Sequence, residues 1–150
     1  MIFRDKIKEL ALKKIFEINC FLVDIRVSPT NDIKVLFDND DGITLEDCMK
    51  VSRHIEENLD RDVEDFKLTV CSPGLENPFI VKEQYLKYIG RDVKVKSING
   101  EIHKGKLISY SDFLKLEILK KNKKNKKIDI HEIIMPIEEI KETKLIIKFK

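Results

Sequence analysis

The feature that most constrains the fold of this chain is a change of hydrophobic pattern across a segment rich in proline and glycine, SPGLENP at residues 72–78. Before this segment, helix-like and strand-like patterns alternate, and after it short strand-like runs follow one another. Proline cannot donate a hydrogen bond to a sheet, and glycine can adopt backbone angles closed to other residues. We therefore expect the segment to end a strand and to separate two domains, residues 1–79 and residues 80–150.

The first 79 residues predict an N-terminal α/β domain with the element order αββαβ. The expected elements are a helix over residues 2–18, strands over 21–28 and 32–38, a helix from Thr44 to about residue 60, and a strand over 66–72. Thr44 and the acids of the following turn are typical of a helix start. Because the last strand returns through a helix, it should run parallel to the second strand, and the helices should cover one face of the sheet.

Residues 80–150 predict a small β-barrel, so the expected fold class of the whole chain is α+β. The expected elements are a short helix over 80–89, strands over 92–98, 103–110, 113–119, 127–133 and 145–149, and a brief helical turn over 136–140. The dipeptide Asn99-Gly100 is typical of a tight turn between two strands. Short strands separated by turns in this way favour a sheet built from local hairpins.

Charge is distributed unevenly along the chain. The net charge is +2, but residues 1–80 contain 11 Lys/Arg and 17 Asp/Glu (−6), whereas residues 81–150 contain 18 and 10 (+8). An acidic module joined to a basic one suggests different partners for the two, and the basic half is the candidate for nucleic acid. No apolar run approaches the ~20 residues needed to span a bilayer, so we expect a cytoplasmic protein without a membrane partner.

The sequence offers little for catalysis. Cys71 and Ser72 stand at an expected strand end, but a nucleophile needs a general base, and His54 is the only histidine of the first domain. The cysteines form no C-x-x-C pair, and no glycine-rich phosphate loop occurs. The acidic run around Gly42 fails as a calcium loop, because Phe37 falls at the first ligand position. We expect no catalytic site, no metal and no cofactor.

Lysines of the basic half are the main candidates for RNA binding. The run KKNKKNKK contains six lysines without an acid and links two expected strands. Alternate residues of a strand share a face, so lysines two positions apart should form paired charges on the barrel surface. The expected RNA-binding residues are Lys94, Lys96, Lys104, Lys106, Lys120, Lys121, Lys123, Lys124, Lys126 and Lys127.

Two alternatives remain open within this basic half. The lysine run is also what a solvated hairpin tip would carry, since lysines discourage edge-to-edge aggregation. Tyr110 and Phe113 are placed to stack on bases, but aromatic residues of strands more commonly pack inward.

Three blocks of the sequence resemble the bacterial ribosome maturation factor RimP family: DDGITLEDCMKVSRHIEENLD, LTVCSPGLENPF and YIGRDVKVK, followed by KETKLIIKF. The resemblance covers essentially the whole chain. It implies an N-terminal α/β domain, a C-terminal SH3-like (Sm-like) barrel and no catalytic site. The family pattern falls on a helix-start motif, Asp41, Gly42, Asp47 and Cys48, and on a junction motif, Ser72, Pro73, Gly74, Leu75 and Pro78. Asn77 and Cys71 stand where the family more often has Arg and Ser.

The resemblance and the charge pattern together suggest a function. We expect a non-enzymatic factor, acting as a monomer, that binds the small (30S) ribosomal subunit and assists its assembly. The basic barrel would contact ribosomal RNA, and the acidic domain would dock a basic ribosomal protein. The alternative is a general RNA-binding Sm-like module without ribosomal specificity.

Overall fold

The computed structural model describes residues 2–147. The chain divides into two compact units, Met1–Pro73 and Gly74–Lys150, and thus between residues 73 and 74 rather than between 79 and 80. The amide of Phe79 donates a hydrogen bond to the carbonyl of Thr143 at 2.8 Å, and the Phe79 ring packs edge-on against Tyr85. These contacts attach the residues just before position 80 to the second unit.

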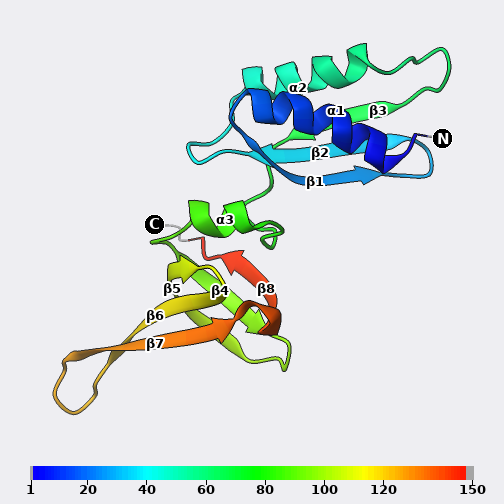
Figure 1. Cartoon of the computed structure of the whole chain (residues 1–150). Coiled ribbons are helices and arrows are strands. Elements are labelled where there is room, and N and C mark those ends of the chain that lie inside the picture. The colour runs from blue at the N-terminus through cyan, green and yellow to red at the C-terminus, as the bar shows by residue number, and fades with distance from the viewer. Residues whose placement is uncertain (1, 148–150) are drawn as a thin grey trace. The chain divides into compact units, whose positions relative to one another are not determined.

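The first unit is a three-stranded sheet with two helices on one face (Figure 1). Its elements are α1 (Arg4–Glu17), β1 (Phe21–Val27), β2 (Asp32–Asp38), α2 (Leu45–Glu57) and β3 (Lys67–Cys71). The strand order is β1-β2-β3, with β1 antiparallel and β3 parallel to β2. The expected αββαβ order and the parallel return of the last strand are confirmed.

The core of this unit follows the predicted periodicities. Helix α1 buries Ile7, Ala11 and Ile15, which recur at helical spacing and face the sheet. Strand β2 buries Val35 and Phe37 on the same side, two positions apart, as the alternation of a strand requires. The two patterns therefore meet in one apolar layer between the helices and the sheet.

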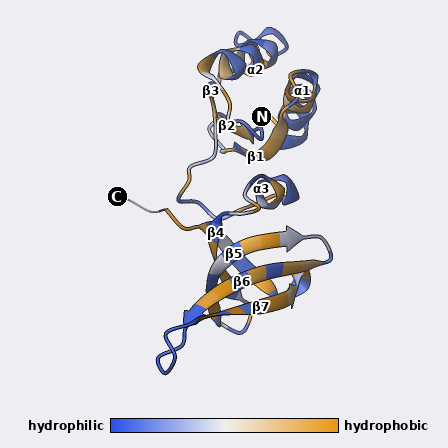
Figure 2. Cartoon of the chain, turned by 90° about the vertical axis from the view of Figure 1, so that its left-hand side faces the viewer, coloured by the Kyte–Doolittle hydropathy of each residue, from blue (hydrophilic) through white to orange (hydrophobic). Residues whose placement is uncertain are grey.

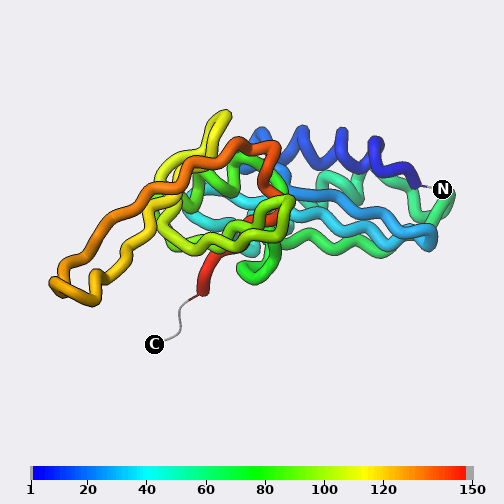
Figure 3. The backbone as a smooth tube through the Cα atoms, turned by 90° about the horizontal axis from the view of Figure 1, so that it is seen from below, coloured from blue at the N-terminus to red at the C-terminus, as the bar shows by residue number. Residues whose placement is uncertain are grey.

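The second unit is a five-stranded antiparallel sheet with a short helix. Its elements are α3 (Lys82–Lys87), β4 (Asp92–Ser97), β5 (Ile102–Tyr110), β6 (Phe113–Lys121), β7 (Ile128–Pro136), the 3-10 helix η1 (Ile137–Glu139) and β8 (Ile140–Leu145). The strand order is β7-β6-β5-β4-β8. This order, with a 3-10 turn before the last strand, is that of an SH3-like barrel. The β6–β7 hairpin extends beyond the rest of its unit (Figure 3).

Aromatic residues fill one side of the second core. The Tyr85 ring stacks on Tyr110 with 3.9 Å between centroids, and the Tyr85 hydroxyl donates to Thr143 Oγ1 at 2.9 Å. Burial raises the pKa of Tyr85, although the hydrogen bond to Thr143 acts in the opposite direction. Helix α3 thus contributes a side chain that links β5 to β8 through the core.

Gly105 allows β5 to lie very close to β6. A Cβ atom at this position would stand 2.8 Å from the Glu117 carbonyl oxygen and 2.9 Å from Cγ1 of Ile118. The first of these atoms belongs to the backbone, so it cannot move aside without shifting the strand. Because β5 and β6 approach so closely here, only glycine fits at position 105.

The closing strand differs from the expectation. It was expected over residues 145–149, but it spans Ile140–Leu145, and positions 148–150 lie outside the described residues. Thr143 and Leu145 are buried, whereas Glu142 and Lys144 are partly exposed, so alternation rather than an apolar run marks this strand. Within residues 2–147, no helix is long and apolar enough to cross a membrane.

Candidate nucleic-acid interface

The helix-start motif holds the beginning of α2. The amide of Asp47 donates to Thr44 Oγ1 at 3.1 Å, and the Asp47 carboxylate accepts from the Thr44 amide at 2.9 Å, which forms a capping box. Gly42 has a φ of +90°, a conformation that residues with a Cβ rarely adopt. Cys48 packs half-buried against the core, and the exposed Asp41 donates its amide to Asn39 Oδ1. These contacts give the motif a structural role.

The junction motif lies where the chain passes from one compact unit to the next. The amide of Asn77 donates to the Gly74 carbonyl at 3.2 Å, which closes a turn over residues 74–77. Gly74 is not among the residues with a left-handed backbone, contrary to the conformational role expected for it. Ser72 and Leu75 are exposed, and Pro73 and Pro78 are half-buried.

One histidine and two thiols of the first unit are partly shielded from solvent. His54 lies in the last turn of α2, and its Nε2 is buried without a hydrogen-bond partner in the described part of the chain. Burial raises the pKa of Cys20 and of Cys48, which is the opposite of what an activated thiolate needs. Among residues 2–147, no group of three His, Cys, Asp or Glu side chains could hold a metal ion.

The candidate lysines of the strands share the outer face of the second sheet. Val93 and Val95 are fully buried, so Lys94 and Lys96, which alternate with them on β4, project outward. Lys94 lies directly opposite Lys104 on β5. The sequence predicted pairs of lysines along one strand, and the structure also places lysines opposite each other on neighbouring strands.

Acids border these lysines on the same face. Lys106 lies opposite Asp92 on one side and opposite Glu117 on the other. Lys96 lies opposite Glu142 of β8. The positive charge of this face is therefore concentrated around Lys94 and Lys104, not spread evenly over all the candidate strand lysines.

One further lysine of this face was missed by the sequence reasoning. Lys144 of β8 lies directly opposite Lys94, on the side away from Lys104. Its ammonium nitrogen is 3.5 Å from a carboxylate oxygen of Glu142. Because the closing strand was expected to start at residue 145, Lys144 fell outside it. The alternation of residues 142–145 is the signal that would have placed it.

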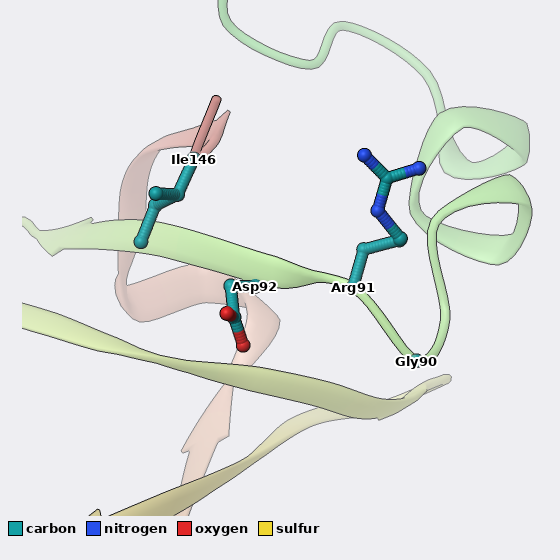
Figure 4. A pocket seen from close by; sticks show the side chains of 4 residues that line it. All are labelled: Gly90, Arg91, Asp92 and Ile146. Carbon is teal, nitrogen blue, oxygen red and sulfur yellow. The ribbon is translucent and has the colours of Figure 1, made fainter. Parts of the chain in front are cut away.

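Two shallow cavities lie on the second unit, and one of them is lined by candidate lysines. One, of about 350 Å³, is lined by Asp92, Lys104, Gly105, Lys106, Glu117, Ile118, Leu119 and Ile146. The other, of about 220 Å³, is lined by Gly90, Arg91, Asp92 and Ile146. In Figure 4, the Arg91 side chain and the Asp92 carboxylate leave successive positions of the chain in different directions. Arg91 is exposed and adds a cation that the sequence reasoning did not single out.

The remaining candidates lie in the tip of the β6–β7 hairpin, the most hydrophilic part of that hairpin (Figure 2). Asparagine side chains fold the tip: Asn122 Oδ1 accepts from the Lys124 amide at 2.9 Å, and Asn125 Oδ1 accepts from the Lys127 amide at 3.0 Å. Lys126 has a φ of +57°. All the candidate lysines of the tip are exposed: Lys120, Lys121, Lys123, Lys124, Lys126 and Lys127.

The two candidate aromatic residues, Tyr110 and Phe113, lie in different environments. Tyr110 packs half-buried against the core of the second unit, stacked on Tyr85, and burial raises its pKa. Phe113 is 51% exposed at the start of β6. Of the two, Phe113 is the more exposed.

Comparisons with known proteins agree with this architecture. Residues 11–76 match the family model described as the RimP N-terminal domain. A ribosome maturation factor RimP of Christiangramia forsetii is 36% identical over 97% of this chain and 99% of the relative. A protein of the same name from Porphyromonas gingivalis is 34% identical over 98% of this chain and 100% of the relative. Another, from Flavobacterium psychrophilum, is 41% identical over 68% of this chain and 67% of the relative. The chain belongs to the ribosome maturation factor RimP family.

Proposed function

We propose that this protein is a non-catalytic factor in the maturation of the small (30S) ribosomal subunit, and that it acts in the cytoplasm as a monomer. The observation that carries the proposal is the match of nearly the whole chain to proteins named ribosome maturation factor RimP. A factor of this kind favours one assembly intermediate, because a binder shifts an equilibrium only through its differential affinity for two states.

The second unit would supply the RNA contact. Its exposed lysines lie on the outer face of β4 and β5 and in the β6–β7 tip, where they are free to approach phosphate groups. Lysine is a compact point charge that suits phosphates, and it lacks the rigid planar fork with which arginine makes bidentate contacts. RNA binding by this unit should therefore depend strongly on salt and weakly on sequence.

The first unit would contact a basic ribosomal protein. Residues 1–73 contain 11 Lys/Arg and 16 Asp/Glu, a net charge of −5 by sequence, which is opposite in sign to such a partner. Complementary charge of this kind raises association rates and excludes partners of the wrong sign. In this view the two units bind different components of one assembly intermediate.

Sedimentation of cell extract tests the proposal. A tagged copy of the full chain should sediment with small-subunit precursors at low salt and be depleted from mature subunits. The purified chain should also bind precursor subunits more tightly than it binds an equal mass of bulk structured RNA. Absence from the precursor fractions would refute the proposed function. Equal affinity for bulk RNA would favour the general RNA-binding module instead.

A further inference from the structure

Three lysines form a row across three neighbouring strands of the second unit. Lys104 on β5 lies directly opposite Lys94 on β4, and Lys94 lies directly opposite Lys144 on β8. Neighbouring strands are about 4.8 Å apart, so the row crosses about 10 Å of the outer face. We call these three residues the lysine row.

Like charges at directly opposite positions of a sheet repel one another and destabilise the fold. The adjacent positions of the same strands avoid this arrangement: Lys106 lies between Asp92 and Glu117, and Lys96 lies opposite Glu142. Within residues 2–147, neither Lys94 nor Lys104 takes part in an ion pair, and Lys144 pairs only with Glu142 of its own strand. The lysine row is thus an unfavourable feature of the free protein, confined to one line across the sheet.

We propose that the lysine row binds consecutive phosphates along one strand of RNA. A polyanion that lies across β5, β4 and β8 would neutralise Lys94 and Lys104, would compete with Glu142 for Lys144, and would reduce the repulsion along the row. This proposal rests on the proposed RNA-binding function and assigns a specific line of contact within it. No aromatic side chain and no arginine belongs to the row, so it recognises the sugar-phosphate backbone and not the bases.

The acids beside the row define the direction of the RNA backbone. Asp92 and Glu117 flank the row on one side, and Glu142 flanks it on the other. A phosphate displaced along the strands would meet Lys96 or Lys106, each of which lies opposite a carboxylate, whereas Lys94 and Lys104 make no ion pair in the described part of the chain. The bound backbone therefore runs across the strands and not along them.

The row has a consequence that an ordinary set of surface lysines lacks. Replacing Lys94, the central residue, removes both cross-strand repulsions at once, so Lys94→Gln should raise the melting temperature of the free protein while it weakens RNA binding. Replacing Lys104 or Lys144 removes one repulsion each and should raise the melting temperature less. Lys141 lies on the same strand as Lys144 but outside the row, and Lys141→Gln is the matched control.

The experiment uses the full chain and two probes, a short RNA duplex and a single-stranded RNA of the same length. The dissociation constant of each variant is measured between about 50 and 200 mM salt. The triple variant Lys94→Gln, Lys104→Gln, Lys144→Gln should lower the magnitude of the slope of log affinity against log salt by about 2–3, since each phosphate contact contributes about 0.7–0.9. Affinity should fall by a similar factor for duplexes of unrelated sequence, and Lys141→Gln should leave the slope unchanged.

The outcomes separate the two proposals. If the unaltered protein binds neither probe, both the proposed RNA-binding function and the row fail. If the unaltered protein binds but the triple variant keeps its slope, the row alone is refuted. The melting temperature gives a readout without RNA: a fall in Lys94→Gln would show that this lysine supports the fold and would overturn the inference.

Discussion

The helix-start motif of the first unit and the lysine surface of the second differ in how their polar groups are used. Thr44 and Asp47 satisfy each other within the fold, and Gly42 supplies a backbone conformation that other residues avoid. Lys94 and Lys104, by contrast, make no ion pair in the described part of the chain, and the lysines of the tip are exposed. The helix-start motif thus builds the structure, whereas the lysines of the second unit are available to a partner.

This comparison predicts that mutations in the helix-start motif reduce stability, whereas mutations of the exposed lysines reduce RNA binding. Spectroscopy can report on the unfolding of each unit separately. All three tyrosines, Tyr85, Tyr88 and Tyr110, belong to the second unit, and the chain contains no tryptophan. Tyrosine fluorescence therefore follows unfolding of the second unit. The two longer helices, α1 and α2, belong to the first unit, so helical circular dichroism follows mainly that unit.

The largest effect is expected from the hairpin tip. Replacing Lys121, Lys123, Lys124 and Lys126 with Glu should weaken binding of structured RNA about 100-fold, or about 2.7 kcal/mol, and flatten its salt dependence, because repulsion replaces phosphate contacts. Both unfolding signals should be unchanged. The control carries the same substitutions at exposed lysines of the first unit, Lys6, Lys8, Lys13 and Lys34. An unaltered salt slope in the tip variant would identify these lysines as a solvated tip only.

A smaller effect, on stability, is expected at Gly105. The added methyl group of Gly105→Ala would meet the Glu117 carbonyl at 2.8 Å, so the variant should destabilise the second unit by about 2 kcal/mol. Urea unfolding followed by tyrosine fluorescence measures this. Gly74→Ala is the control, because its methyl group would meet only the flexible side chain of Asn77. Equal stability of the two variants would contradict the close approach of β5 and β6.

The smallest effect is expected at the helix start. Thr44→Ala removes the acceptor for the Asp47 amide and should destabilise the first unit by about 1 kcal/mol. Thr44→Ser keeps a hydroxyl and should restore most of this loss. The RNA salt slope should be the same in all three proteins. A change of slope in Thr44→Ala would mean that the motif contributes to RNA binding and would break the comparison.

Much of the fold could be predicted because local patterns and topology agree. The helical spacing of Ile7, Ala11 and Ile15 and the alternation of Val93 and Val95 are visible in the sequence and match the buried faces. The parallel return of β3 followed from the handedness and reach of a helical crossover. The closing strand was misplaced because its inward residues include Thr143, whose hydroxyl bonds to Tyr85, a partner 58 residues away.

The candidate site was less predictable, because it depends on register between strands. Sequence alone shows that Lys94 and Lys104 lie on exposed faces, but only the pairing of β4 with both β5 and β8 shows that Lys94 stands between two other lysines. A slip of one residue in either pair would move one partner to the inner face. Such pairing is fixed by the packing of the whole sheet and leaves no short motif in the sequence.

The pairing of β4 with β8 also determines when each unit can fold during synthesis. The first unit needs no residue beyond β3, which ends at Cys71, so its sheet can form while the rest of the chain is still being translated. The second unit cannot complete its sheet until Leu145 has emerged to pair with Val93. The lysine row is assembled by that same event, because Lys144 arrives with the closing strand. A nascent chain would therefore gain its acidic unit early and its complete basic surface only in the final steps of folding.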